Sequence, residues 1–121
     1  KAINQGLRTA ENFPAIDVYE TKTDVVIVTE PLAGVDPSTI DVSVEDDVVV
    51  ISGETQPARY LPDEASLIQE IYYGPFTRSV RIPRSIHVGK AKASFRQNVL
   101  TVTLPKLRPD VGDIIDVTPT A

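Results

Sequence analysis

Residues 95–106 constrain the fold of this chain most strongly, because their side chains alternate in character. Three apolar residues would lie on one face of an extended strand and two threonines on the other: Leu100, Val102 and Leu104 against Thr101 and Thr103. Pro105 should end this strand, since proline has no N–H to donate to a sheet. Asn98 tolerates the left-handed backbone of a tight turn, and the residues before it alternate as well. The stretch therefore predicts a β-hairpin.

Similar short runs recur along the chain, separated by proline, glycine and aspartate. Residues 16–20 predict an edge strand, and the β-branched run 25–28 predicts a strand covered on both faces. Residues 40–45 and 48–51 predict a second hairpin that turns at Asp46 and Asp47. About seven or eight such strands with little helix indicate an all-β fold, an antiparallel β-sandwich.

The segment after this second hairpin has two unusual features. Residues 54–66 are polar and predict an exposed loop, long enough to carry the apolar strand at residues 67–73 away from its own sheet. Arg78 falls on the apolar side of the next strand and needs a carboxylate, because an unpaired buried charge is costly. Either feature could belong to an interface between subunits. The alternatives are ordinary strand packing for Tyr72 and Tyr73 and an intramolecular salt bridge for Arg78.

Composition narrows the possible functions. The 121 residues carry a net charge of −5 without a basic stripe, so neither nucleic acid nor an anionic membrane is an expected partner. The chain has no cysteine and one histidine, His87, and its glycines form no phosphate loop. Asp46 and Asp47 could be imagined as a catalytic pair of acid and base, but they are turn residues whose side chains would point to opposite sides. We therefore expect no enzyme activity, no metal and no cofactor.

Location and completeness are also expectations. Without cysteine, a secretory signal or a long apolar run, the sequence is compatible with a reducing cytoplasm, where we expect the protein to act. The chain contains no methionine and starts at Lys1, so we expect a fragment or a processed form.

Several motifs resemble the alpha-crystallin domain of small heat-shock proteins of the bacterial, plant and archaeal type. The run from Asn98 to Lys106 resembles that family's Gly-Val-Leu-x-Val-x-x-Pro-Lys pattern, with asparagine in place of the usual glycine. Residues 73–83 are similar to a second signature that contains the arginine matching Arg78, and residues 51–54 and 17–21 also fit. Residues 31–35 match only in a shifted form. In the tail, Ile115 and Val117 resemble the family's Ile-x-Val motif.

This resemblance implies an immunoglobulin-like sandwich at residues 13–106, between a residual N-terminal arm at 1–12 and a C-terminal extension at 107–121. It implies an ATP-independent chaperone of the stress response that holds partly unfolded client proteins and forms a dimer and higher homo-oligomers. It assigns a dimer interface to Leu67, Ile68, Ile71, Tyr72 and Arg78. It also implies that the tail residues Ile115 and Val117 enter a groove on a neighbouring subunit, which is formed by Ile40, Val42, Val44, Ala91, Ala93 and Phe95. The alternative is a monomeric β-sandwich co-chaperone or adaptor module.

Overall fold

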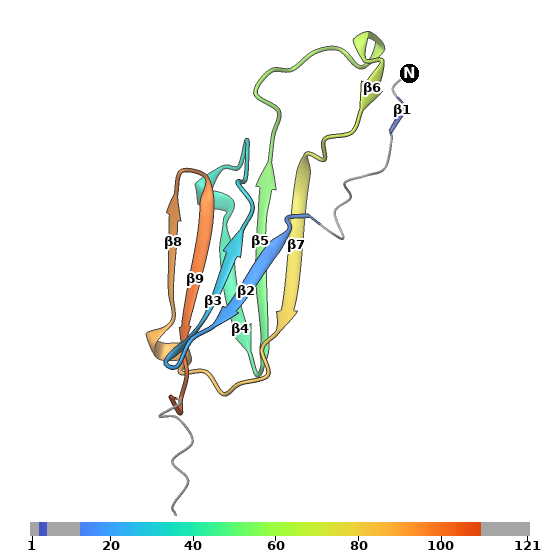
Figure 1. Cartoon of the computed structure of the whole chain (residues 1–121). Helices are drawn as coiled ribbons and strands as arrows, with labels where there is room; N and C mark the ends of the chain where they lie inside the picture. Colours follow the sequence, from blue (N-terminus) through green and yellow to red (C-terminus); the bar gives the residue numbers. More distant parts are fainter. Residues whose placement is uncertain (1–2, 5–12, 110–121) are drawn as a thin grey trace, which may run out of the picture.

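A computed structural model of the chain describes residues 3–4 and 13–109, and within them two antiparallel sheets face each other (Figure 1). The four-stranded sheet has the order β2 (Ile16–Glu20), β3 (Asp24–Thr29), β9 (Val99–Pro105) and β8 (Lys92–Arg96). The three-stranded sheet has the order β4 (Asp41–Glu45), β5 (Val48–Thr55) and β7 (Gly74–Arg81). The predicted β-sandwich is confirmed.

A small third sheet lies away from the sandwich, on the long excursion between β5 and β7 (Figure 1). It consists of β6 (Ile68–Gln69) and β1 (Ile3–Asn4), which run parallel. The remaining elements described are three short 3-10 helices: η1 (Pro37–Thr39), η2 (Asp63–Ala65) and η3 (Val88–Lys90). None of the described helices is long and apolar enough to cross a membrane.

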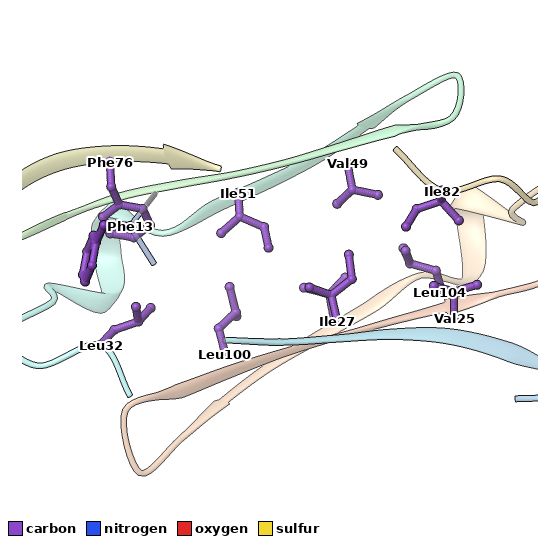
Figure 2. Close-up of a cluster of buried hydrophobic side chains, with 11 residues drawn as sticks. Phe13, Val25, Ile27, Leu32, Val49, Ile51, Phe76, Ile82, Leu100 and Leu104 are labelled. Carbon is purple, nitrogen blue, oxygen red and sulfur yellow. The ribbon is translucent and has the colours of Figure 1, made fainter. Parts of the chain in front are cut away.

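The core lies where the inner faces of the two sheets meet. Val49 and Ile51 of β5 face Ile27 of β3 and Leu100 of β9 across the sandwich (Figure 2). All four side chains are buried, and burial of one such side chain contributes roughly 1.5–3 kcal/mol. The predicted alternation of β9 is confirmed, because Leu100, Val102 and Leu104 are buried and its threonines are half-exposed.

Both predicted hairpins are confirmed in backbone detail. Gln97 and Asn98 have φ of 52° and 65°, so the β8–β9 turn uses the left-handed region at two successive positions. Asp46, at the β4–β5 turn, has φ of 57°. Aspartate and asparagine accept this backbone more readily than other residues with side chains, which explains why polar turns close these apolar strands.

The prediction that residues 25–28 are covered on both faces is wrong. Val25 and Ile27 are buried, whereas Val26 and Val28 are only half-buried on the opposite face of β3. The three-stranded sheet covers the inner face alone, and a β-branched run forms such a strand equally well. Continuous β-branching therefore indicated a strand and overstated its burial.

The strand predicted over residues 67–73 is also shorter than expected. Only Ile68–Gln69 pairs as a strand, and its partner is the parallel β1. Tyr72 instead turns back onto the sandwich, where its ring packs against Phe13 with ring centroids 5.6 Å apart. Aromatic burial at the end of the core thus interrupts the apolar run.

Candidate interaction sites

The excursion between β5 and β7 carries six large, exposed apolar side chains, which we name together the loop patch: Tyr60, Leu61, Leu67, Ile68, Ile71 and Tyr73. Leu67 and Ile71 are 84% and 69% exposed. Three residues predicted for the dimer interface, Leu67, Ile68 and Ile71, belong to this patch. Exposed apolar surface of this kind commonly marks a contact with another molecule.

Tyr72 was predicted for the same interface but occupies a different position. It is half-buried and packs against the core, and its hydroxyl donates to the backbone carbonyl of Pro75. Phe13 completes the cluster by meeting Phe76 edge to face, with centroids 5.4 Å apart. Within one chain Tyr72 therefore has the packing role that the sequence left as the alternative.

Arg78 lies on the inner face of β7, in the apolar phase that the sequence predicted. Its guanidinium Nε donates to the carbonyl of Pro14 at 3.0 Å, and the side chain is half-buried. Within residues 13–109 no carboxylate lies within ion-pair distance of it. A backbone carbonyl thus satisfies part of its hydrogen-bonding capacity, and a carboxylate partner stays a prediction.

A groove opens between β4 and β8, the edge strands of the two sheets. Its volume is about 240 Å³, and it is lined by Val42, Val44, Val88, Ala91, Lys92, Ala93, Val102 and Leu104. The structure thus brings together four of the six predicted groove residues. Ile40 and Phe95 are half-buried against the core and do not line this cavity. The predicted occupants, Ile115 and Val117, lie outside the described residues.

Four lining residues were not predicted for the groove: Val88, Lys92 and the two core residues Val102 and Leu104. Val88 is 53% exposed at the start of η3, outside the strands that the sequence predicts. Lys92 is the first residue of β8 and also lines the groove. The available signal for Val88 was an apolar residue next to a glycine, between two predicted strands.

A buried lysine at the end of β9 was also missed. The side chain of Lys106 is 2% exposed, and its Nζ lies 2.6 Å from Oε2 of Glu20 at the end of β2. Arg84 Nε lies 2.7 Å from the same oxygen. The hydrogen bond from Lys106, followed by that from Arg84, lowers the pKa of Glu20 below its ordinary value of 4.5. The cluster joins the ends of two strands and the loop after β7.

The strand period could have revealed this cluster. Lys106 continues the inward phase of Leu100, Val102 and Leu104, and Glu20 continues the inward phase of β2. Two opposite charges at inward positions near strand ends indicate an ion pair, because buried charges need partners.

His87 and Asp47, titratable residues of types used in catalysis, lie on different turns of the surface. His87 is exposed at the start of η3, and Asp47 forms a surface ion pair with Arg81 at 3.1 Å. Among the residues that the structure describes, no cluster of histidine, cysteine, aspartate and glutamate could hold a metal ion.

The class of protein follows from the similarity of the chain to a known family. The model of the Hsp20/alpha crystallin family matches residues 17–118, so the chain belongs to this family, that of the small heat-shock proteins. The resemblance predicted from the motifs is confirmed.

Individual relatives support this family assignment. The chain is 35% identical to the spore protein SP21 of Stigmatella aurantiaca over 98 residues, which are 81% of this chain and 57% of that protein. It is also 35% identical to heat shock protein 16 of Schizosaccharomyces pombe over 99 residues, which are 80% of this chain and 68% of that one. The chain therefore spans little more than half the length of the Stigmatella protein.

Solved structures show the same fold. Heat shock protein 16.0 from Schizosaccharomyces pombe superposes with a TM-score of 0.70 at 31% identity, covering 87% of this chain and 97% of that one. HspA from Xanthomonas axonopodis gives a TM-score of 0.69 at 29% identity, covering 79% and 95%.

The Glu20 cluster leads to a pH-dependent prediction. The folded-state pKa of Glu20 is lowered, so its contribution to stability is complete above pH 4.5 and is lost as the pH falls through that lowered value. Glu20→Gln should therefore lower the melting temperature at pH 7, and the difference from the parent should shrink in acid. Thermal unfolding of both proteins followed by circular dichroism between pH 7 and pH 3 measures this.

A matched control is Asp47→Asn, which breaks the exposed ion pair with Arg81. Exposed pairs contribute little, so this variant should melt close to the parent throughout the pH range. A Glu20→Gln difference that stays constant down to the lowest pH at which both proteins fold would contradict the prediction.

Proposed function

We propose that this chain acts in the cytoplasm as an ATP-independent holdase, which binds partly unfolded proteins and prevents their aggregation. The observation that carries the proposal is the loop patch, whose large apolar side chains are exposed to solvent beside the β-sandwich of a small heat-shock protein. Partly unfolded proteins expose apolar segments and strand edges, and they aggregate through these surfaces. Apolar surface on the chaperone competes for the same segments.

The first step of assembly is a dimer formed through the loop patch. The β2 strand ends the four-stranded sheet, so it offers an edge to which a segment of a second copy can add. The resemblance to the family implies that the segment around β6 makes this exchange. Displacing water from Leu67, Ile68 and Ile71 supplies the favourable free energy. Arg78, held near the start of β2 by its bond to Pro14, then meets a carboxylate of the partner.

The second step joins dimers through the tail. In an extended segment Ile115 and Val117 point the same way, so both can enter the groove between β4 and β8 of a neighbouring subunit. Burial contributes roughly 1.5–3 kcal/mol for each side chain, and ordering the segment costs about 1–2 kcal/mol per residue. One tail therefore binds weakly, and many tails on linked subunits stabilise the assembly together.

Chaperone activity is tested by light scattering of a model protein that is denatured by heat. The chain should suppress the scattering in proportion to its concentration, and adding ATP should change nothing, because the sequence contains no phosphate-binding loop. An equal mass of an unrelated β-sandwich protein is the control. Suppression that strictly requires ATP, or none by this chain or any longer natural form of it, would refute the proposal.

The dimer is tested with Leu67→Ser combined with Ile71→Ser. Both side chains are exposed in the single chain, so the melting temperature of the sandwich should barely change. Loss of their burial in the dimer should raise its dissociation constant at least about a hundredfold, measured by sedimentation equilibrium.

Two further variants complete the dimer experiment. Arg78→Ala should also weaken the dimer, whereas Val88→Ser changes another exposed apolar residue outside the loop patch and should leave it intact. A dissociation constant that neither the double variant nor Arg78→Ala alters would rule out this interface.

The tail is tested by replacing both Ile115 and Val117 with glycine. Particles larger than the dimer should shift towards dimers, steeply with protein concentration, while thermal unfolding of the sandwich stays nearly unchanged. Thr118→Gly combined with Thr120→Gly is the matched control, because it adds the same backbone freedom without removing apolar side chains. If the double apolar variant keeps the parent's mass at every concentration, the tail has no role in assembly.

A further inference from the structure

The groove between β4 and β8 lies between two sheet edges, and the apolar lining does not decide which of them receives an incoming strand. β8 ends the four-stranded sheet and β4 ends the three-stranded sheet. Each edge presents backbone N–H and C=O groups that a further strand can pair with. The inference below rests on the proposed docking of the tail, and it concerns the edge that the tail chooses.

The outer face of β8 is basic. In the β8–β9 register Ala93 and Phe95 stand opposite the buried Val102 and Leu100, so these two residues face inward. The alternate residues of β8 therefore face outward, and they are Lys92, Ser94 and Arg96. Lys90 precedes them at the end of η3. Within residues 13–109, neither Lys92 nor Arg96 forms an ion pair.

The outer face of β4 has the opposite charge. Val42 and Val44 stand opposite the buried Ile51 and Val49, so they face inward into the groove. The outward residues of β4 are Asp41, Ser43 and Glu45. The two rims of one apolar groove thus differ in the sign of their charge.

The tail is acidic. Residues 110–121 include Asp110, Asp113 and Asp116 and no lysine or arginine. If Ile115 and Val117 enter the groove, the side chain of Asp116 between them points to the outer face of whichever sheet the tail extends. Beside β8 it would meet Lys92, whereas beside β4 it would meet Asp41 and Glu45. Opposite charges on adjacent strands stabilise a pair, and like charges destabilise it.

We propose that the tail of a second copy pairs with the edge of β8, with Asp116 beside Lys92 on the outer face of the four-stranded sheet. Ala91 and Ala93 line the groove on either side of Lys92, just as Ile115 and Val117 flank Asp116. This three-residue match centres Asp116 on Lys92 whether the strands run parallel or antiparallel. Lys92 is then a specificity-determining residue, which favours tails that carry an acid between the two apolar residues.

A peptide of residues 110–121 tests the proposal. The receptor is the full chain with Ile115→Gly and Val117→Gly, so that its own tail does not compete, and binding is followed by fluorescence anisotropy of the labelled peptide. Lys92→Glu in the receptor should weaken binding of the natural peptide by roughly two- to fivefold, the range for one cross-strand charge pair. Asp116→Lys in the peptide should weaken binding to the unchanged receptor similarly. Combining the two reversals should restore most of the affinity.

The ionic strength of the buffer gives an independent readout. The Debye length falls from about 10 Å at 0.1 M salt to about 3 Å at 1 M, so added salt should weaken the natural pair and reduce the effect of Lys92→Glu. Glu45→Lys is the matched control on the opposite rim and should cause no loss of binding.

Each result has a distinct meaning. Binding that strengthens with the Asp116→Lys peptide and ignores Lys92→Glu would place the tail on β4 and overturn the assignment. Equal affinities for all combinations would also overturn it while leaving tail docking intact. Failure of the natural peptide to bind at all would refute both the docking and the choice of edge.

Discussion

The rest of this structure depends on the packing of its two sheets against each other. The inward face of β3 and β9 packs against the inward face of β5. Leu100 and Ile27 lie against Ile51 and Val49 in a layer closed from water (Figure 2). Burial of apolar surface is the main favourable term in folding, and here these central strands supply most of it. The edge strands β2, β4, β7 and β8 are positioned by pairing with this centre.

The groove follows from the same construction. Inner faces of the edge strands continue the core, but at β4 and β8 the sheets stop before they close over it, so Val42, Val44 and Ala93 stay partly uncovered. An apolar surface that extends the core without a cover is suited to an added strand, because backbone pairing and side-chain burial are available together. An incomplete core thus leaves apolar surface uncovered between the two edges, and the charge of each rim comes from the outward-facing residues of the same strands.

Charged residues occupy a few of the inward-facing positions of the strands, outside the apolar core. Lys106 and Glu20 continue the inner faces of β9 and β2, and they meet in an ion pair at the end of the sandwich. Arg78 interrupts the inner face of β7 and donates to the carbonyl of Pro14. Charges at such positions require partners, so they fix the ends of the strands relative to one another.

The sequence by itself determined most of the strands, the two hairpins and the family, because the two-residue period, the left-handed turn residues and the motifs are local properties of the chain. It also placed Arg78 on an inner face and named four residues that meet in the groove. Only the tertiary structure decided that Val26 and Val28 are half-exposed, that Tyr72 packs on Phe13, and that Lys106 reaches Glu20. These outcomes depend on which layer covers a face and on which strand ends lie together. Such contacts join residues far apart in the sequence, and periodicity alone does not encode them.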